Sequence, residues 1–315
     1  MKSKVVFGRN LMVRLVLLLC LVFVSQATVY AANKIVLGKY PDIKIGFTTA
    51  NFLKFCPPSV PNIKKLLDFA GDQGFVFIEI RDPNASLTVN ECKEIAAYAR
   101  HAGVEVVYAM NPGATDPNYW EVFARGIANA QVFDGPKVVR IGANGGEMMV
   151  SDTKTHWTAE DFAKIVQNTN MAANYAKMFG LQFLTENARE SLQGDGVTTF
   201  GTTELFGPKG VNSNVGLQLD VANFFCTARI PADPAAVKAF VAANVSKIGY
   251  THLKTSKNHV PQQVLDGNEL PFDAYFSLLQ KNGKNYVAIE LDAAATLDDA
   301  FANHIKSVQY LMKNY

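Results

Sequence analysis

Eight short runs rich in β-branched and aromatic residues recur along the chain, and each is followed by a longer segment of mixed apolar and polar residues. Short apolar runs of this kind are typical of buried strands, and the longer mixed segments are typical of amphipathic helices. Successive runs begin 29 to 44 residues apart. The predicted strands cover residues 43–47, 75–80, 104–108, 137–141, 181–186, 215–220, 247–252 and 286–290.

The segments between these runs carry start and stop signals of helices. Pro61 opens a helix that ends before Gly74, and Pro234 opens another. Thr158 followed by Asp161 resembles a capping box with an aspartate at the third helical position. The helical patterns cover residues 62–70, 163–178, 234–241 and 297–312.

The alternation of strands and helices predicts one parallel sheet, because parallel strands need a crossover connection. Eight units within the 284 residues from 32 to 315 match the size of a (β/α)8 barrel, which takes roughly 250 residues. An open doubly wound sheet is the alternative, but it usually has a glycine-rich first turn, and residues 47–51 read Phe-Thr-Thr-Ala-Asn. We therefore expect an α/β fold, a single-domain TIM barrel over residues 32–315.

The first 31 residues have the pattern of a secretory signal peptide. Basic residues precede the apolar run 13–24, and small residues end at Ala31 and Ala32. An uncleaved membrane anchor is the alternative, but the clean apolar stretch is about ten residues long and a spanning helix needs roughly 20. We expect residues 1–31 to direct export, so that the protein is periplasmic or extracellular and has no stable membrane anchor.

The charge of the chain changes when this segment is set aside. The full sequence has 30 basic and 28 acidic residues, and four of the basic residues lie in the first 31 positions. The remaining 26 basic and 28 acidic residues give a slightly acidic protein. Such a balance argues against nucleic acid as a partner, because nucleic-acid-binding surfaces are strongly basic.

Three cysteines remain after the leading segment, namely Cys56, Cys92 and Cys226. An exported protein can form a disulfide, and Cys56 with Cys92 is the conceivable pair. Three thiols in a chain of this length are nevertheless no disulfide framework, and we favour buried free cysteines.

Two long connections follow the carboxyl ends of the fourth and fifth predicted strands. They cover residues 142–157 and 194–210, and the second is rich in Gly, Thr and Ser. Barrels build their active sites at this end, so both are candidate rim or lid loops. For residues 194–210, a disordered decoration is the alternative.

Charged side chains gather at the carboxyl ends of the predicted strands. A charge inside an apolar strand is costly unless it is paired or bound to a metal. Charges scattered over a surface would not share this position so often, whereas a site on the upper face of a barrel requires it. The residues are Glu79, Arg81, Arg140, Glu186, Asp220, His252 and Glu290.

Four of these residues end the last four strands and would converge on one point: Glu186, Asp220, His252 and Glu290. Three carboxylates and one imidazole suit Mn²⁺, Mg²⁺ or Co²⁺, with Zn²⁺ as a further candidate. Each residue alone also has a structural explanation, since a carboxylate can cap a helix and a histidine can be hydrogen-bonded in the core. Their common position favours a divalent metal site.

The sequence resembles the xylose isomerase-like barrel superfamily, in particular its sugar phosphate isomerase/epimerase branch, which includes the ketose 3-epimerases and hydroxypyruvate isomerase. The opening of the second strand, residues 74–79, and the tail segment 266–273 are similar to that branch. The residues that carry the resemblance are Glu186 in Phe-Leu-Thr-Glu-Asn, Asp220 in Gln-Leu-Asp, His252 in Tyr-Thr-His-Leu-Lys and Glu290 in Ala-Ile-Glu.

The resemblance implies a metal-dependent sugar isomerase or epimerase that abstracts a proton next to a carbonyl and passes through an enediolate. It implies that Glu186 and Glu290 act as base and acid, with Asp220 and His252 chiefly as ligands. A small sugar or keto-sugar is the implied partner, and the chain is a candidate homo-oligomer. Candidate substrate-binding residues are Glu79, Arg81, Arg140, Lys254 and His259.

The chain departs from the family pattern at two places. Members often have a histidine three residues after the strand-six aspartate, where this chain has Asn223. They often follow the strand-seven histidine with an acidic residue and then an arginine, where this chain has residues 254–259, Lys-Thr-Ser-Lys-Asn-His. His259 is a candidate replacement for one missing polar group.

Three other functions remain as alternatives. The same site could drive elimination or hydration of a 3-keto-sugar or 3-keto-glycoside, and export favours free sugars over phosphorylated ones. A non-catalytic sugar-binding barrel is the second alternative, although binding alone does not require two opposed carboxylates. Endonuclease IV has the same fold but needs several more strand-end histidines, so DNA repair is disfavoured.

Overall fold

Eight parallel strands form a closed barrel in the computed structural model, which describes residues 33–143, 153–228, 230–266 and 271–315. The order around the barrel is β1-β12-β9-β8-β6-β4-β3-β2, and every neighbouring pair is parallel. The barrel strands are β1 (Lys44–Thr48), β2 (Phe77–Arg81), β3 (Glu105–Ala109), β4 (Val138–Gly142), β6 (Gln182–Glu186), β8 (Val215–Asp220), β9 (Ile248–Leu253) and β12 (Tyr286–Ile289).

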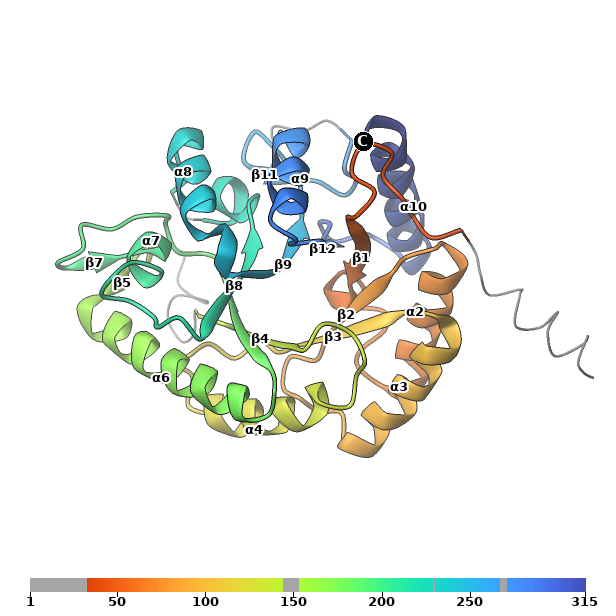
Figure 1. Ribbon diagram of the computed structural model, residues 1–315, viewed down its shortest axis with the longest axis horizontal. Coiled ribbons are helices and arrows are strands. Elements are labelled where there is room, and N and C mark those ends of the chain that lie inside the picture. Colours follow the sequence, from red (N-terminus) through yellow and green to blue (C-terminus); the bar gives the residue numbers. More distant parts are fainter. Residues whose placement is uncertain (1–32, 144–152, 229, 267–270) are drawn as a thin grey trace, which may run out of the picture.

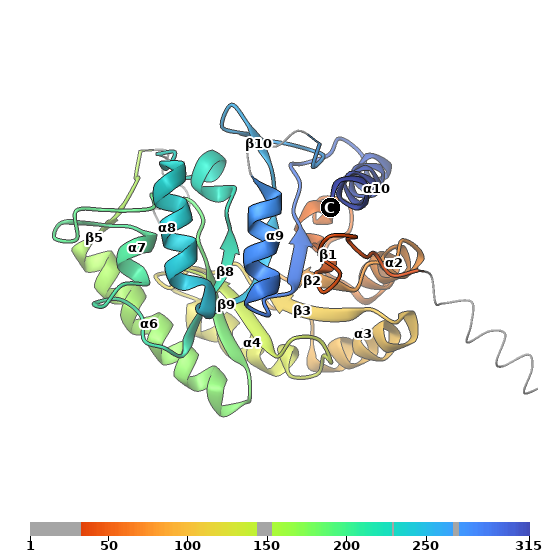
Figure 2. The same ribbon diagram turned by 45° about the horizontal axis from the view of Figure 1, so that its top comes forward.

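The observed strands confirm the predicted (β/α)8 TIM barrel. Each barrel strand begins within two residues of its predicted start. The helices surround the strands, as Figures 1 and 2 show from two directions. The predicted signal peptide and residues 144–152 of the first long connection lie outside the described residues.

Several helices begin at a side chain that caps their first turn. Thr158 accepts the backbone N–H of Asp161 at the start of α6, and Asp233 accepts two N–H groups at the start of α8. The helices are α2 (Val60–Asp72), α3 (Val89–Ala102), α4 (Tyr119–Ala130), α6 (Ala159–Met178), α7 (Thr202–Leu205), α8 (Pro234–Asn244), α9 (Phe272–Lys281) and α10 (Leu297–Asn314), with 3₁₀-helices η1 (Thr49–Phe52) and η3 (Val245–Lys247) and the π-helix η2 (Asn223–Thr227).

The second long connection, residues 194–210, is folded and is not a disordered decoration. It contains β7 (Thr199–Phe200), which pairs antiparallel with β5 (Trp157–Thr158), and α7. A hairpin of β10 (Ser256–Lys257) with β11 (Val260–Pro261) follows β9. Both small sheets lie in connections that follow the carboxyl ends of barrel strands, where the predicted site residues lie.

The interior of the barrel is filled by side chains that lie two positions before the site residues. Phe77, Leu184 and Tyr250 belong to a small buried cluster, separate from the larger core that involves the helices. Small residues make room for them, since a Cβ at Gly46 would overlap the Phe77 ring. Side chains alternate between the two faces of a strand, so Glu79, Glu186 and His252 point into the barrel above this layer.

Cys56, Cys92 and Cys226 are free in the structure, and Cys56 and Cys92 are buried. This agrees with the interpretation of the cysteines as buried thiols, and the conceivable Cys56–Cys92 pair does not form. Among the described helices, none has the length and apolar character needed to cross a membrane.

His304 on α10 provides a test of the packing between α10 and the barrel. Its ring is buried against Phe47 and Phe52, and its Nδ1–H donates to the Ala300 carbonyl at 2.8 Å. Burial lowers the pKa of His304 to about 4, although the bond to Ala300 opposes this shift. The unfolded chain therefore takes up a proton below about pH 6.5, whereas the folded chain does so only near pH 4.

We expect the stability that rests on neutral His304 to be complete above pH 6.5 and to be lost as the pH falls toward 4. Between pH 7.5 and 5, wild type should lose about 2 kcal/mol of unfolding free energy more than His304→Leu. Urea unfolding of both proteins at the two pH values measures this difference. Parallel losses in the two proteins would contradict the assignment.

Candidate metal centre

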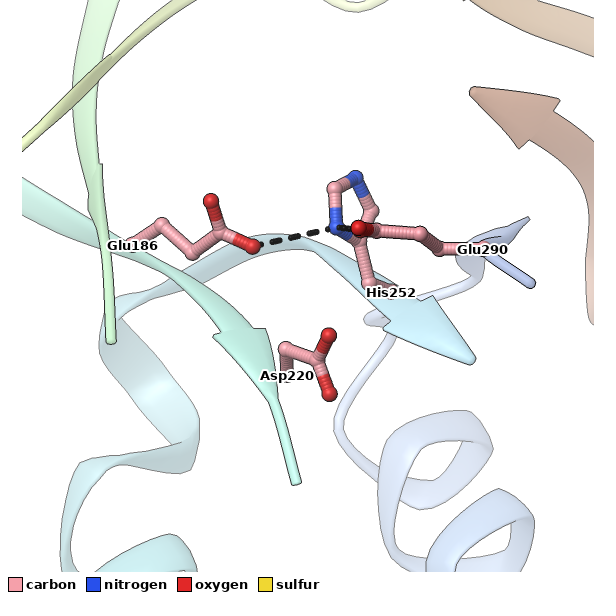
Figure 3. A group of neighbouring side chains, drawn as sticks. All are labelled: Glu186, Asp220, His252 and Glu290. Carbon is pink, nitrogen blue, oxygen red and sulfur yellow. Dashed lines mark hydrogen bonds and ion pairs between the residues drawn. The ribbon is translucent and has the colours of Figure 1, made fainter. Parts of the chain in front are cut away.

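The four predicted ligands come together at the carboxyl ends of adjacent strands. Glu186 ends β6, Asp220 ends β8, His252 lies near the end of β9, and Glu290 directly follows β12. One nitrogen or oxygen atom from each lies within 4.8 Å of the others. Figure 3 shows Glu186 and Glu290 reaching toward His252 from opposite sides, with Asp220 nearby.

His252 is the centre of this cluster. Its Nδ1 lies 3.1 Å from Glu186 Oε1 and also contacts Glu290 Oε2. Its Nε2 lies 2.7 Å from Glu79 Oε2, and an ionised carboxylate can only accept, so Nε2 carries a proton. This bond leaves Nδ1 as the atom that can ligate a cation, the arrangement in which an outer carboxylate orients a ligating histidine.

The carboxylates around His252 favour a positive charge at the centre of the cluster. Burial lowers the pKa of His252, but the Glu79 and Glu290 carboxylates outweigh burial and raise the pKa above its ordinary value. The carboxylates thus favour a proton on the imidazole. A cation bound among the same groups would supply this positive charge instead.

Glu79 is fixed from several directions beneath His252. It accepts hydrogen bonds from Thr48 Oγ1 at 2.7 Å, Tyr250 Oη at 2.5 Å and Arg81 Nε at 2.9 Å. Burial would raise the pKa of Glu79, but Arg81 and His252 outweigh it and hold the pKa well below its usual range. Glu79 is therefore an ionised group that orients His252 and does not reach the open side of the cluster.

Replacing Glu79 with Gln tests this positioning role. The amide cannot hold Nε2–H as a carboxylate does, so we expect about 10- to 100-fold weaker Mn²⁺ binding. Isothermal titration of the metal-free proteins measures the change. Glu105→Gln, at the first residue of β3 and the opposite end of the barrel, is the control and should bind as wild type does. Equal affinity in Glu79→Gln would contradict the role.

Arg140 holds the outer oxygen of Glu186. Its Nη2 pairs with Glu186 Oε2, while Nε donates to Gln218 Oε1 at 3.1 Å and Nη1 donates to the Met110 carbonyl at 2.7 Å. Burial and the nearby charge of Arg81 lower the pKa of Arg140 to about 10. Glu186 is thereby left with Oε1 directed at His252.

Lys254 lies beside the other two carboxylates. Its Nζ is 3.1 Å from Asp220 Oδ2, 3.2 Å from Glu290 Oε1 and 3.0 Å from Asn223 Oδ1. The backbone N–H of Asn223 also donates to Asp220 Oδ1 at 3.1 Å. Burial raises the pKa of Asp220, although Lys254 opposes the rise.

The donor set fits a divalent cation. Asp220 Oδ2 and Glu290 Oε2 are buried, and no described residue gives either a donor in hydrogen-bonding geometry, although Lys254 and His252 lie close to them. Buried carboxylate oxygens normally have a hydrogen-bond donor or a cation as a partner. A cation could be the partner here, because three carboxylates and one imidazole converge. Hard ions with oxygen and imidazole ligands suit this set.

His259 lies on the turn between β10 and β11, and its described contact is not with the four residues. Its Nδ1 lies 2.9 Å from the Phe225 carbonyl, and both His259 and Asn258 have positive φ angles. Its role in substrate binding stays a prediction. Glu79, Arg140 and Lys254 do contact residues of the cluster, and Arg81 contacts Glu79.

Several neutral residues of the site are not found by sequence reasoning. In the sequence they resemble ordinary strand or turn residues. Burying a neutral polar side chain costs less free energy than burying a charge, so such a residue is less conspicuous within an apolar strand. The alternation along a strand could have found Gln218, which lies two positions before Asp220. The missed residues are Thr48, Asn111, Asn187, Gln218 and Tyr250.

A pocket of about 220 Å³ opens beside Glu290. Glu290 is the least buried of the four cluster residues, with 20% of its side chain exposed. The pocket therefore lies next to the one cluster residue that is partly exposed. Its lining residues are Ala50, Asn51, Lys54, Phe55, Glu290, Leu291, Ala293 and Ala294.

The sequence profile described as "Xylose isomerase-like TIM barrel" matches residues 67–313. The chain belongs to the xylose isomerase-like TIM barrel family. The match begins on α2 and extends into α10, so it includes all four cluster residues. No curated protein matches the chain.

Solved structures of this family have the same fold. A xylose isomerase-like TIM barrel protein from Mycobacterium smegmatis in complex with magnesium has 16% identity, a TM-score of 0.64, and coverage of 86% of this chain and 97% of that one. A 3-keto-D-glucoside 4-epimerase from E. coli has 17% identity, a TM-score of 0.61, and coverage of 86% of this chain and 99% of that one. A sugar phosphate isomerase/epimerase from Parabacteroides distasonis has 16% identity, a TM-score of 0.59, and coverage of 86% of this chain and 98% of that one.

Proposed function

We propose that this protein is a divalent-metal-dependent isomerase or epimerase of a sugar or keto-sugar, acting by proton transfer next to a carbonyl. The observation that carries the proposal is the placement of Glu186 and Glu290 on opposite sides of His252, within one cluster of potential ligands. The names of the similar structures, a 3-keto-D-glucoside 4-epimerase and a sugar phosphate isomerase/epimerase, support this class of reaction.

The proposed metal is held by Glu186, Asp220, His252 Nδ1 and Glu290. Held by these residues, a divalent ion would supply positive charge next to the substrate carbonyl. Members of the family typically depend on a divalent metal, and one similar structure is a magnesium complex. The ligand set is compatible with Mn²⁺, Mg²⁺ or Co²⁺.

We assign Glu290 as the acceptor of the substrate proton, because it lines the pocket and is the least buried of the four cluster residues. Burial would raise the pKa of Glu290, but the charges of Lys254 and His252 outweigh it and hold the pKa well below its usual range. Glu290 is therefore ionised at neutral pH, as a base must be. Glu186 lies on the other side of His252, where a proton returned to the opposite face of the carbon would invert it.

The pocket beside Glu290 is the proposed site for the sugar body. Phe55 offers an aromatic surface, and Asn51 and Lys54 offer polar groups for hydroxyl oxygens. Mixed apolar and polar linings of this kind are usual for small-molecule sites. Because Glu290 forms one wall, a sugar in the pocket would have its reacting carbon next to the proposed base.

The proposed export limits which sugars the protein would meet. The pattern of residues 1–31 favours a periplasmic or extracellular protein, and phosphorylated sugars are mainly intracellular. We therefore propose free sugars, keto-sugars or glycosides as substrates.

Elimination or hydration at a 3-keto-glycoside is the second candidate reaction. It is favoured by the likeness to a 3-keto-D-glucoside 4-epimerase and by the pocket beside Glu290, which leaves space for a substituent. The first step would be the same abstraction of a proton next to the ketone. The two reactions differ in whether the proton returns or a group at the adjacent carbon leaves.

NMR spectroscopy of reactions in D₂O distinguishes these functions. Mn²⁺-loaded protein is incubated with a series of free ketoses and with methyl 3-keto-glucoside. Deuterium at the carbon next to the carbonyl, with an inverted centre or a shifted carbonyl, supports the isomerase or epimerase. Release of methanol supports elimination. Sugar binding without exchange or release would contradict both enzymatic functions and leave a sugar-binding barrel.

A further inference from the structure

Lys254 places a compact positive charge among the proposed metal ligands. Its side chain is 9% exposed, and its Nζ lies 3.1 Å from Asp220 Oδ2 and 3.2 Å from Glu290 Oε1. Two of the four proposed ligands are therefore already paired with a cation that belongs to the chain. A divalent ion on the same two carboxylates would have this ammonium as a close neighbour of like charge.

The ammonium is held in this place by the fold. Lys254 comes one residue after β9 ends and two after His252, so its backbone is tied to the barrel rim. Asn223 Oδ1 accepts from Nζ at 3.0 Å, and Asn223 Nδ2 itself donates to the Asn187 carbonyl at 2.8 Å. Lys254 therefore has little freedom to move away from the carboxylates when a metal arrives.

Arg140, which also contacts a ligand, is arranged differently. It touches Glu186 but also donates to Gln218 and to the Met110 carbonyl, so its guanidinium is shared among neutral acceptors. The charge of a guanidinium is delocalised over three nitrogens, whereas an ammonium is a point charge. Lys254 is therefore the stronger competitor of a small divalent ion.

We propose that the Lys254 ammonium competes with the divalent ion for Asp220 and Glu290. It balances the carboxylates when no ion is bound, and it weakens ion binding so that the metal exchanges with solution and is not held permanently. The inference rests on the proposed function only in requiring that the cluster bind a divalent ion.

The test is the affinity of metal-free protein for Mn²⁺, followed by the electron paramagnetic resonance signal of free Mn²⁺. We expect Lys254→Met, which keeps the length of the side chain but removes its charge, to bind Mn²⁺ at least about tenfold more tightly than wild type. Lys254→Arg keeps the charge and should remain within about threefold. Lys44→Met removes the same charge from an ion pair at the start of β1, at the opposite end of the barrel, and should not change the affinity.

A second measurement reports on the balance of charge without metal. Without Mn²⁺, Lys254→Met should melt at a lower temperature than wild type, because its carboxylates are uncompensated, and it should gain more on addition of Mn²⁺. Lys254→Gln serves the same purpose if the methionine variant does not fold. Equal or weaker Mn²⁺ binding by the neutral variants overturns the inference while leaving the proposed function standing. Absence of Mn²⁺ binding in wild type and variants alike would instead remove the proposed metal centre.

Discussion

Replacement of Glu290 with Gln is expected to lower turnover by about 10³-fold, a larger loss than we expect from any other single side chain of the site. The amide keeps the shape of the carboxylate but cannot accept a proton, and Glu290 is the ionised group at the open side of the cluster. The rate of deuterium incorporation into the substrate in D₂O, at saturating Mn²⁺, measures the loss. Unchanged incorporation would contradict the assignment of the base.

Two companion variants make this result specific. Asp292→Asn alters an exposed carboxylate two residues later, outside the lining of the pocket, and should change the rate by less than about twofold. Glu186→Gln should retain some deuterium incorporation but lose inversion, because Glu290 can still remove the proton. If both glutamine variants lose incorporation and inversion equally, the division of roles between the two glutamates is wrong.

Removal of the metal is expected to abolish turnover while leaving the protein folded. After dialysis against a chelator, the carboxylates remain paired with Arg140, Lys254 and His252, so the barrel has its charges compensated. Activity should fall by about 10³-fold or more and return on addition of Mn²⁺, Mg²⁺ or Co²⁺. Circular dichroism, elemental analysis and the exchange rate are measured on the same sample. Full activity in protein shown to contain no metal would contradict metal dependence.

The fold could be predicted because the strands are short runs with many apolar residues and several helices begin at a local cap. A strand such as Tyr286–Ile289, buried at its last three positions, stands out in a sequence by its apolar content alone. The ends of elements are harder to predict, since the start of a strand depends on the register of its neighbours. β2 begins at Phe77, two residues after its predicted start, because its pairing with β1 begins there.

The four proposed ligands could be predicted because a charge at the end of an apolar strand is conspicuous. Which residue each ligand contacts could not be predicted where the contact crosses the barrel. Glu79 on β2 bonds to His252 on β9, and these strands are not neighbours in the sheet. Neither the spacing of residues nor their type shows which interior side chains meet across the barrel. For the same reason, His259 resembles a site residue in the sequence although the β10–β11 hairpin carries it to Phe225.

Anomalous diffraction from crystals soaked in Mn²⁺ tests the central claim most directly. We expect one strong manganese peak among Glu186, Asp220, His252 Nδ1 and Glu290, with Glu79 still bonded to His252 Nε2. The peak should weaken when the crystals are washed in metal-free buffer, since the bound ion exchanges. A manganese peak elsewhere in the protein, or none between these four side chains at millimolar Mn²⁺, would contradict the metal centre on which the proposed reaction depends.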